Sequence, residues 1–383
     1  MPIYKMKGSK DGKGKYRVRI NYQDALGKYR QIDRVVYGSA EAKEAERELL
    51  FQVKNEIPAQ RMSVKGLYDE YVKVKANELR ETSLQKTMTI LATHVLPNLG
   101  QVSLSKLTLP VLQNWKLYME DKKVVLKSGN ERPLGLRTKQ NAYSELRALL
   151  NYAVKMEYLP KNPLSKIGNF KDPGALQEKM NYYTADEYKT FISKARECAE
   201  NSPTNTDWDF YVFFSLAFYT GMRKGEIHAL KWSDIDGEYI HVSRSIAQKL
   251  KGDDRETPPK NKSSIRTLQM PKPLIDILQQ HKARYKQLQG FSDDFRVCGG
   301  TRPLRDTSIQ NANKKYAALA GLKTIRIHDF RHSHASLLAN DGINIQEIAR
   351  RLGHSKIEIT WNTYSHLYPR EEERAVNILN KIV

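Results

Sequence analysis

The segment from His328 to Tyr364 limits what this chain can fold into more than any other part of the sequence. Apolar residues recur at helical spacing on both sides of a central Asp-Gly pair, which predicts two short helices packed across a turn. His328 and Arg331 are three residues apart and share a helix face. Packing of the two helices would bring them together with His354 and Tyr364. The apolar positions are Leu337, Leu338, Ile345, Ile348, Ala349 and Leu352.

This combination of side chains is suited to phosphate chemistry. An arginine fork and imidazole donors match the non-bridging oxygens of a phosphate, and a nearby tyrosine hydroxyl can act as a covalent nucleophile. His328 and Arg331 lack the neighbouring acid of a zinc-binding helix, and no Asp/Glu cluster typical of magnesium accompanies them. We therefore expect neither a metal nor a cofactor. Each histidine alone also fits an ordinary polar residue, and it is the joint pattern that favours the site.

Three segments resemble the signature boxes of the tyrosine recombinase family, in particular the integrases of temperate phages and conjugative transposons. They read YTGMRKGEIHALKW, HDFRHSHAS and LGHSKIEITWNTYSHL, and a weaker resemblance covers nearly the whole chain. The resemblance implies that Tyr364 attacks a DNA phosphate to form a 3′-phosphotyrosine. This bond stores the energy for religation, so neither ATP nor a metal ion is needed.

The resemblance also implies a role for each residue around the scissile phosphate. Arg223 and Arg331 would grip the non-bridging oxygens and stabilise the charge of the transition state. His328 and His354 would add hydrogen bonds, and His328 is a candidate to take the proton of the tyrosine.

Two assignments within this set have rivals. The family uses a lysine on a β-hairpin loop as general acid, and Lys260 fits that position better than Lys262, although an alternating strand would aim both to one face. Tyr368 and Tyr316 are rival nucleophiles. The resemblance favours Tyr364, because the family places its tyrosine shortly after the LGHS box and just before a Ser/Thr-His pair, as at Tyr364-Ser365-His366.

Composition favours a polyanionic partner. Lys and Arg outnumber Asp and Glu by 64 to 43, a formal charge of +21, which favours nucleic acid over a small neutral substrate. The two cysteines, Cys198 and Cys298, do not indicate a disulfide framework, and no apolar run is long enough for a membrane span. We expect a protein of the bacterial cytoplasm, associated with the nucleoid. A length of 383 residues predicts two or three domains.

Residues 1–57 are predicted to form a small basic module. Its first 37 residues hold ten Lys/Arg interleaved with tyrosines, and alternating segments predict a small β-sheet followed by a helix from Ser39. An exposed basic sheet face suits a reader of a DNA groove, although a solvated charged sheet explains the same pattern. The resemblance favours an arm-type DNA-binding domain with candidate contacts at Arg17, Arg19, Arg30 and Arg34.

Residues 61–166 are predicted to form a bundle of four or five helices. Apolar stripes run through residues 67–74 and 84–95, and a long helix is expected over 138–157. The resemblance makes this bundle the core-binding domain. Its predicted exposed cations include the candidate DNA contacts Arg80, Lys86, Arg137 and Lys139, although an ordinary charged helical surface explains them equally well.

Residues 180–383 are predicted to form a mixed α/β catalytic domain. Thr184 begins a capping box, and the apolar run FYVFFSLAFYTG must be buried. This run delivers Gly221, where the chain turns so that Arg223 emerges at a helix start. Glu226 lies one turn further on and can hold that arginine. Two strands are expected in EYIHVSRSIA and SIRTLQM.

The carboxyl-terminal tail, residues 370–383, is predicted to form a short helix with one apolar face. So short a helix is marginal in water unless that face is buried. The helix could dock on its own domain, but the resemblance favours docking on a neighbouring subunit, because family members exchange a carboxyl-terminal segment within a tetramer. The apolar positions are Ala375, Val376, Leu379, Ile382 and Val383.

Together these features predict a multidomain, mainly α chain with small β-sheets that acts as a site-specific DNA recombinase. Such an integrase would insert and excise a mobile element, bind double-stranded DNA at core and arm sites as a homotetramer, work with excision or DNA-bending factors, and have no membrane partner. A type IB topoisomerase is an alternative, against which the separate basic β-module argues. A non-catalytic DNA-binding regulator is another, but a mere binder has no need of Tyr364 beside Arg223 and Arg331.

Overall fold

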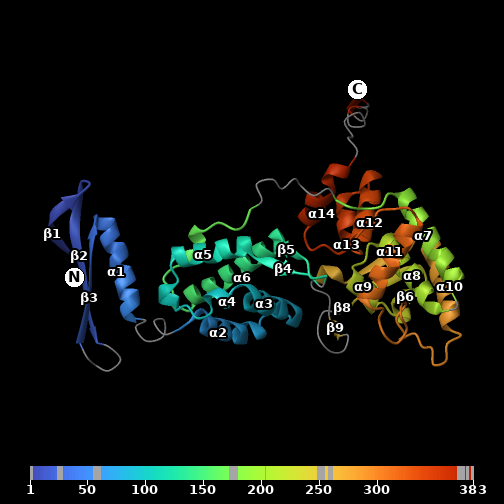
Figure 1. Ribbon diagram of the computed structural model, residues 1–383. Coiled ribbons are helices and arrows are strands. Elements are labelled where there is room, and N and C mark those ends of the chain that lie inside the picture. Colours follow the sequence, from blue (N-terminus) through green and yellow to red (C-terminus); the bar gives the residue numbers. More distant parts are fainter. Residues whose placement is uncertain are drawn as a thin grey trace. The chain divides into compact units, whose positions relative to one another are not determined.

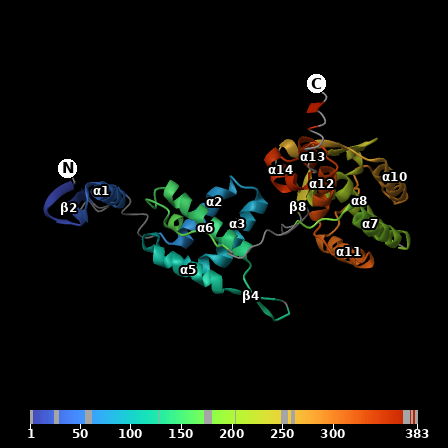
Figure 2. The same cartoon turned by 90° about the horizontal axis from the view of Figure 1, so that it is seen from above.

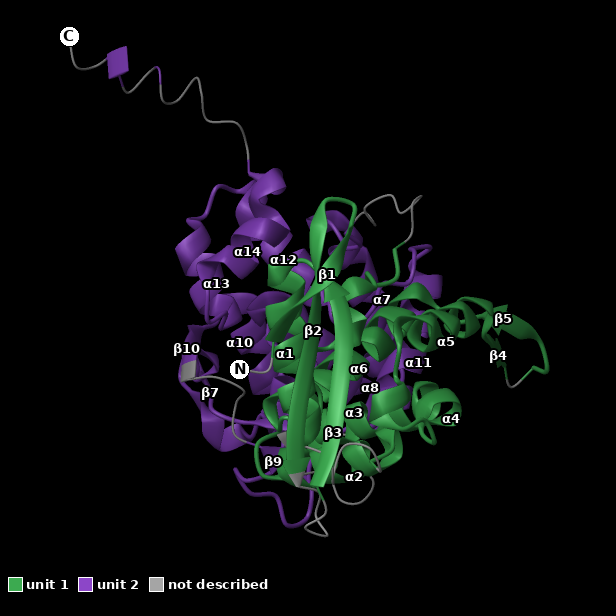
Figure 3. Cartoon of the chain, turned by 90° about the vertical axis from the view of Figure 1, so that its left-hand side faces the viewer, with its two compact units in different colours: residues 1–176 green, residues 177–383 purple. Residues whose placement is uncertain are grey.

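The computed structural model consists mainly of helices with small antiparallel sheets, and it divides into two compact units, residues 1–176 and 177–383 (Figure 1 and Figure 3). None of the helices in the described part of the chain is long and apolar enough to cross a membrane. The structure describes residues 3–23, 29–54, 62–126, 128–171, 180–202, 204–247, 255–257, 262–368, 376, 379 and 380.

The amino-terminal module is an antiparallel sheet with one helix on one face. Strands β1 (Ile3–Lys10), β2 (Lys13–Gln23) and β3 (Tyr29–Tyr37) are in sequential order, and α1 (Ser39–Lys54) follows. Figure 2 shows α1 lying along the sheet. Alternation along β2 turns Val18 and Ile20 toward α1, where they pack with three buried residues of the helix. This confirms the predicted sheet and helix. The helix residues are Ala42, Ala45 and Leu49.

The second part of the same unit is a helical bundle with its own core, which includes Leu67, Leu91, Trp115 and Leu146. The predicted apolar stripe ends before Val74, which is 37% exposed. A short antiparallel hairpin lies between two of the helices. The elements are α2 (Val64–Ala76), α3 (Glu81–His94), α4 (Leu96–Leu99), η1 (Leu104–Lys106), α5 (Leu109–Asp121), β4 (Lys123–Val125), β5 (Glu131–Pro133), α6 (Leu136–Lys155) and η2 (Pro163–Lys166).

The second unit begins with two long helices. Helix α7 (Ala185–Glu200) starts at the predicted capping box, in which Thr184 and Glu187 exchange hydrogen bonds. Helix α8 (Asn205–Thr220) is apolar on nearly all sides and nearly all of its residues are buried, as the sequence required. Helices α10 (Lys272–Tyr285) and α11 (Asp306–Leu319) also contribute to this core.

Two small sheets lie between α9 (Lys224–Ala229) and α10. The strands predicted around residues 240 and 267 pair antiparallel, with His241 opposite Thr267. The elements are η3 (Trp232–Asp234), β6 (Ile235–Asp236), β7 (Tyr239–Val242), β8 (Ser245–Ala247), β9 (Arg255–Thr257), η4 (Lys262–Ser264) and β10 (Arg266–Gln269).

Gly221 sets the direction of the chain into the site. Its φ of +64° is left-handed, a conformation that glycine adopts without a steric penalty. A Cβ at this position would come within 2.7 Å of the His334 ring and 2.9 Å of the Leu352 side chain. The backbone at Gly221 therefore lies close to the segments that contain His334 and Leu352. Arg223 follows as the N-cap of α9.

The predicted pair of short packed helices is α12 (Asp329–Asn340) and α13 (Ile345–Leu352), followed by α14 (Ile357–Tyr364) and η5 (Ser365–Leu367). Ala335, Ile348, Leu352 and Tyr364 share one buried cluster. Leu337 was expected in this core but is 40% exposed. Most of the tail beyond residue 368, where a docking helix was expected, lies outside the described residues.

Candidate active site

Glu226 is the central carboxylate of the site and is only 4% exposed. Its Oε2 accepts a hydrogen bond from the Arg223 backbone N–H (2.9 Å) and its Oε1 accepts one from Arg223 Nη1 (2.9 Å). On the other side, Arg266 donates from Nη2 to Oε2 (2.9 Å) and from Nη1 to Oε1 (3.2 Å). Burial alone would raise the pKa of Glu226, but the hydrogen bonds and charges of these arginines outweigh it and lower the pKa. Glu226 therefore remains ionised.

Arg331 joins the segments that surround the site. This residue of α12 is 3% exposed. It donates from Nη1 to the Gly221 carbonyl (2.7 Å) and from Nη2 to the Leu352 carbonyl (2.6 Å), and Nη2 lies 2.9 Å from His354 Nε2. Burial and then the positive charge of Arg223 lower its pKa to about 9, so the guanidinium is still charged at neutral pH.

His354 is held on both sides of its ring. A guanidinium can only donate, so the Nε2 facing Arg331 must be the lone-pair acceptor. Nδ1 then carries the proton and donates to Thr360 Oγ1 at 2.8 Å. Arg223 Nη2 donates to the Gly353 carbonyl next to it (3.1 Å). Burial and then Arg331 and Arg223 lower the pKa of His354 to about 4, which keeps the ring neutral.

Tyr364 is the last residue of α14 and is 1% exposed. Its hydroxyl oxygen lies 2.7 Å from Nδ1 of His332 on α12. Burial raises the pKa of Tyr364 to about 12. His328 lies one turn before His332, and their rings meet edge to face at 5.1 Å. Loss of hydration and the charge of His332 lower the pKa of His328 to about 4.

The electrostatics of the site favour an anion. Three guanidinium groups, those of Arg223, Arg266 and Arg331, are gathered around one carboxylate, Glu226. Burial is the main cause of the lowered pKa values of His328 and His354, and the positive charges of Arg331 and Arg223 lower both values further. A phosphate placed here would relieve this repulsion, as preorganised phosphate sites do.

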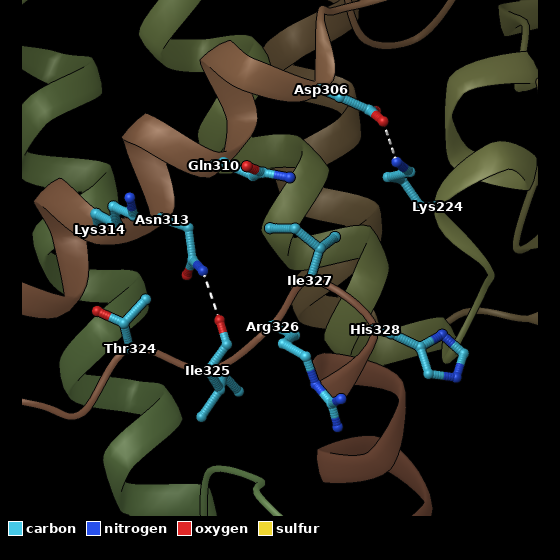
Figure 4. A pocket seen from close by; sticks show the side chains of 10 residues that line it. All are labelled: Lys224, Asp306, Gln310, Asn313, Lys314, Thr324, Ile325, Arg326, Ile327 and His328. Carbon is cyan, nitrogen blue, oxygen red and sulfur yellow. Dashed lines mark hydrogen bonds and ion pairs between the residues drawn. The ribbon is translucent and has the colours of Figure 1, made fainter. Parts of the chain in front are cut away.

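A pocket of about 550 Å³ continues from the site along α11 (Figure 4). Lys224 pairs with Asp306 in its wall, and Asn313 donates to the Ile325 carbonyl at 2.6 Å. A hydrogen bond with His228 and, against the effect of burial, a second one with Lys224 lower the pKa of Asp306 to about 2. The lining residues are Lys224, Asp306, Gln310, Asn313, Lys314, Thr324, Ile325, Arg326, Ile327 and His328.

The structure brings together most of the residues selected from the sequence. Arg223, Arg331 and His354 meet through direct contacts or through the Gly353 carbonyl, and Tyr364 reaches the same helix as Arg331 through His332. Glu226 holds Arg223 as expected.

The rival residues have different outcomes. Tyr316 is fully buried in the main core and donates to Asp207 (3.1 Å), and Tyr368 donates to the Ile343 carbonyl (2.6 Å). Both hydroxyls are therefore engaged away from the arginines. Lys260 lies outside the described residues, and Lys262 begins η4, although the position of its side chain is not among those described.

Three residues of the site were missed from the sequence: His332, Arg266 and Thr360. His332 is four residues after His328, so helical spacing alone would have placed both on one face. Arg266 alternates with Leu268 on the buried side of β10, and a charged residue in a buried strand position signals a buried ion pair. No comparable pattern marks Thr360.

The four candidate arginines of the amino-terminal module do not share one face. Arg17 and Arg19 point away from α1, where both pair with Asp33. Arg34 lies opposite Val18 and Arg30 lies opposite Tyr22, which places both on the face that α1 covers. Arg34 pairs there with Glu48 at 2.6 Å.

In the helical bundle, the expectation that Lys139 is an exposed cation was wrong. It is 9% exposed and its ammonium pairs with Glu120 at 2.6 Å. It lies on the inner face of α6 because helical spacing aligns it with the buried Ala142, Tyr143 and Leu146. Arg80, Lys86 and Arg137 are exposed.

Comparison with known proteins agrees with this geometry. Residues 181–371 match the phage integrase family, and residues 64–171 match the phage integrase SAM-like domain. The ICEBs1 integrase of Bacillus subtilis is 30% identical over 260 residues, covering 66% of this chain and 68% of that protein. The chain belongs to the phage integrase family of tyrosine recombinases. The family expected from the three sequence boxes is thereby confirmed.

A further relative and two solved structures also resemble this recombinase. The XerC-like tyrosine recombinase of Caldanaerobacter subterraneus is 32% identical over 261 residues, covering 62% of this chain and 64% of that protein. The Tn1549 transposon integrase has a TM-score of 0.65 at 20% identity, covering 84% of this chain and 99% of that one. A lambda integrase tetramer bound to a Holliday junction has a TM-score of 0.56 at 17% identity, covering 97% of each chain. These two likenesses confirm the expected multidomain fold.

Replacing Glu226 with Gln in the recombinase should strongly destabilise the catalytic domain. The change leaves two arginines without their shared counter-charge, and breaking a buried ion pair costs about 3–5 kcal/mol. Urea denaturation followed by circular dichroism would measure the loss. The matched control is Glu197→Gln, which removes an exposed pair with Lys194 and should cost under about 1 kcal/mol. Equal small losses in both variants would show that Glu226 does not anchor the site.

Proposed function

We propose that this chain is a site-specific DNA recombinase that cleaves and rejoins DNA through a 3′-phosphotyrosine on Tyr364. The observation that supports this most is the convergence of Arg223, Arg331 and His354, together with a buried tyrosine that is bonded through His332 to the helix of Arg331, in a chain of the phage integrase family. A merely DNA-binding protein would not need this tyrosine next to a cluster of arginines.

In the proposed reaction, the scissile phosphate binds at Arg223, whose side chain is 37% exposed, and reaches the buried Arg331 beside it. Negative charge develops on the non-bridging oxygens as Tyr364 attacks, and the guanidinium groups stabilise it. In the free protein Arg331 and His354 bond to each other. We infer that a phosphate oxygen takes the place of His354 as the acceptor from Arg331. The proton of the neutral His354 ring then shifts to Nε2, which donates to DNA, while Nδ1 accepts from the Thr360 hydroxyl. His328, at the edge of the adjoining pocket, donates a further hydrogen bond.

The leaving 5′ oxygen must receive a proton, and we assign this role to Lys260, with Lys262 as the rival. Religation runs the same steps backward: the 5′ hydroxyl attacks the phosphotyrosine and Tyr364 leaves. The phosphotyrosine keeps the energy of the broken phosphodiester. The cycle accordingly uses no ATP.

The partners follow from the relatives. The Tn1549 integrase was solved with transposon end DNA, and lambda integrase was solved as a dimer on a core site and as a tetramer on a Holliday junction. We infer that this chain binds double-stranded DNA of a mobile element and assembles as a homotetramer on two duplexes in the bacterial cytoplasm. A type IB topoisomerase would also relax DNA by this chemistry. It would not exchange strands between two duplexes.

We further propose three domains: an arm-binding domain (1–57), a core-binding domain (61–166) and a catalytic domain (180–383). Separate hydrophobic cores support the division. In the first domain, Arg17 and Arg19 occupy the open sheet face beside the exposed Tyr4. We assign the arm contact to this face. Arg80, Lys86 and Arg137 remain candidates in the second domain.

Tyr364→Phe should abolish covalent attachment to DNA and leave binding nearly unchanged. The variant lacks the attacking hydroxyl, whereas affinity comes mainly from contacts with many phosphates. A nicked suicide substrate would trap the covalent complex of the parent on a denaturing gel. Tyr368→Phe is the matched control and should still form the complex. An adduct that persists in Tyr364→Phe would overturn the assignment.

Lys260→Ala should lose cleavage of ordinary DNA and regain it on a substrate whose leaving oxygen is replaced by sulfur. A thiolate departs without a proton, so it does not need the general acid. Single-turnover cleavage of the two substrates gives the comparison. Lys262→Ala is the control, and rescue of that variant instead would transfer the role to Lys262.

Deletion of residues 1–57 should leave cleavage of a core site intact and remove binding to a separate arm site. The deleted residues include no member of the proposed catalytic set. Gel-shift titrations with each site, together with suicide-substrate cleavage, would test this. Equal binding of both sites by the truncated protein, or loss of cleavage, would contradict the proposed division.

A further inference from the structure

His332 is the side chain in direct contact with the reacting atom of the proposed nucleophile. Its Nδ1 lies 2.7 Å from the Tyr364 hydroxyl oxygen, the distance of a strong O–H···N hydrogen bond. The two rings are tilted by 53° with centroids 5.8 Å apart, so the contact runs in from the edge of the imidazole. Arg331 directly precedes His332 on α12. The proposed phosphate ligand and the residue that contacts the tyrosine hydroxyl therefore lie on one helix.

We propose that His332 is the general base that accepts the proton of Tyr364 during cleavage and returns it during religation. This inference rests on the proposed function, because it names the proton acceptor of that reaction. His332 stands apart from His328, which the sequence suggested for this role. In the structure His328 lies one helical turn before His332. The two rings meet edge to face, and His328 also lines the pocket.

The protonation state of His332 fits a base. Burial lowers its pKa, and Arg331 and Arg326 lower it further, against the opposing effect of Asp329. The ring is consequently neutral at pH 7, and Nδ1 can accept the tyrosine proton. The charged and titratable groups around it are Asp329, Arg326, Arg331 and His328 from α12 and the segment before it, and Tyr364 from α14.

Asp329 gives the protonated form a stabilising neighbour. It is 1% exposed and accepts hydrogen bonds from the Arg326 backbone N–H (2.9 Å) and from Arg326 Nε. Its carboxylate acts on His332 in the direction that favours the imidazolium. A buried carboxylate one turn away can thus support the positive charge that appears when the proton is transferred.

Cleavage breaks one O–H bond and one P–O bond, and each proton has a named acceptor. The Tyr364 O–H bond breaks, its proton moves to Nδ1, and the oxygen forms the new bond to phosphorus. The bond from phosphorus to the 5′ oxygen breaks, and that oxygen takes a proton from the lysine general acid. In religation the tyrosine oxygen leaves phosphorus and recovers its proton from the His332 imidazolium, while the lysine takes the proton of the attacking 5′ hydroxyl.

The test is the pH dependence of single-turnover cleavage by His332→Asn in the full-length protein. Asparagine keeps a polar atom near the position of Nδ1 but cannot take the proton. The parent rate should level off above the pKa of the imidazole, because the base is then neutral. The variant should be slower by about 100-fold at pH 7, and its rate should keep rising about tenfold per pH unit toward pH 9, as the tyrosine ionises unaided.

Chemical rescue separates a base from a structural residue. His332→Ala leaves space beside the tyrosine, and added imidazole should restore cleavage at a rate that increases with the basicity of substituted imidazoles. A sulfur leaving group should not rescue either His332 variant, because the missing group acts on the nucleophile and not on the leaving oxygen. His332→Gln serves as a second variant if the asparagine protein does not fold.

His241→Asn is the matched control. This exposed histidine of β7 bonds to Thr267, and its replacement should leave the rate and pH profile unchanged. A parent-like pH profile in His332→Asn would overturn the proposal even if the rate fell. Faster cleavage would overturn it too, because the contact would then be a restraint on the tyrosine. Absence of any covalent complex in the parent would instead refute the proposed function.

Discussion

The site depends on one buried carboxylate shared by two arginines. Glu226 meets Arg223 on one side and Arg266 on the other, and all of these groups except part of Arg223 are removed from solvent. Arg266 also donates to the Arg351 carbonyl (2.7 Å) and the Ser264 carbonyl (3.1 Å). The start of α9, the strand β10 and the end of α13 are thereby tied to a single negative charge. The orientation of Arg223 is fixed before any DNA arrives, which is the condition for electrostatic catalysis.

Around this anchor, the site keeps an excess of positive charge and neutral imidazoles. The excess charge attracts phosphate, while the neutral rings remain able to exchange protons. Burial is the main reason that the rings stay neutral, and the nearby guanidinium groups make protonation of His328 and His354 still less favourable. Tyr364 stays protonated in the free protein, because burial raises its pKa to about 12.

Much of this arrangement could be predicted from the sequence, because it depends on local patterns. Helical spacing located α12 and α13, the capping box located α7, and the three boxes identified the family. Errors arose where the answer depends on tertiary contacts. The faces of Arg30 and Arg34 follow from strand register, which the sequence alone does not set. Lys139 was misplaced because its partner Glu120 lies on another helix. Thr360 is recognised only from the fold, where it bonds to His354.

The hydrogen bonds of Arg331 also determine when the site can assemble. Its guanidinium is held by the carbonyls of Gly221 and Leu352, which lie 110 and 21 residues away in the sequence. These acceptors exist only after the whole carboxyl-terminal unit has collapsed around α12. An unfinished chain on the ribosome, or a proteolytic fragment, therefore has no assembled centre for breaking a DNA strand. The position of Arg331 is thus a property of the folded unit and not of any one segment.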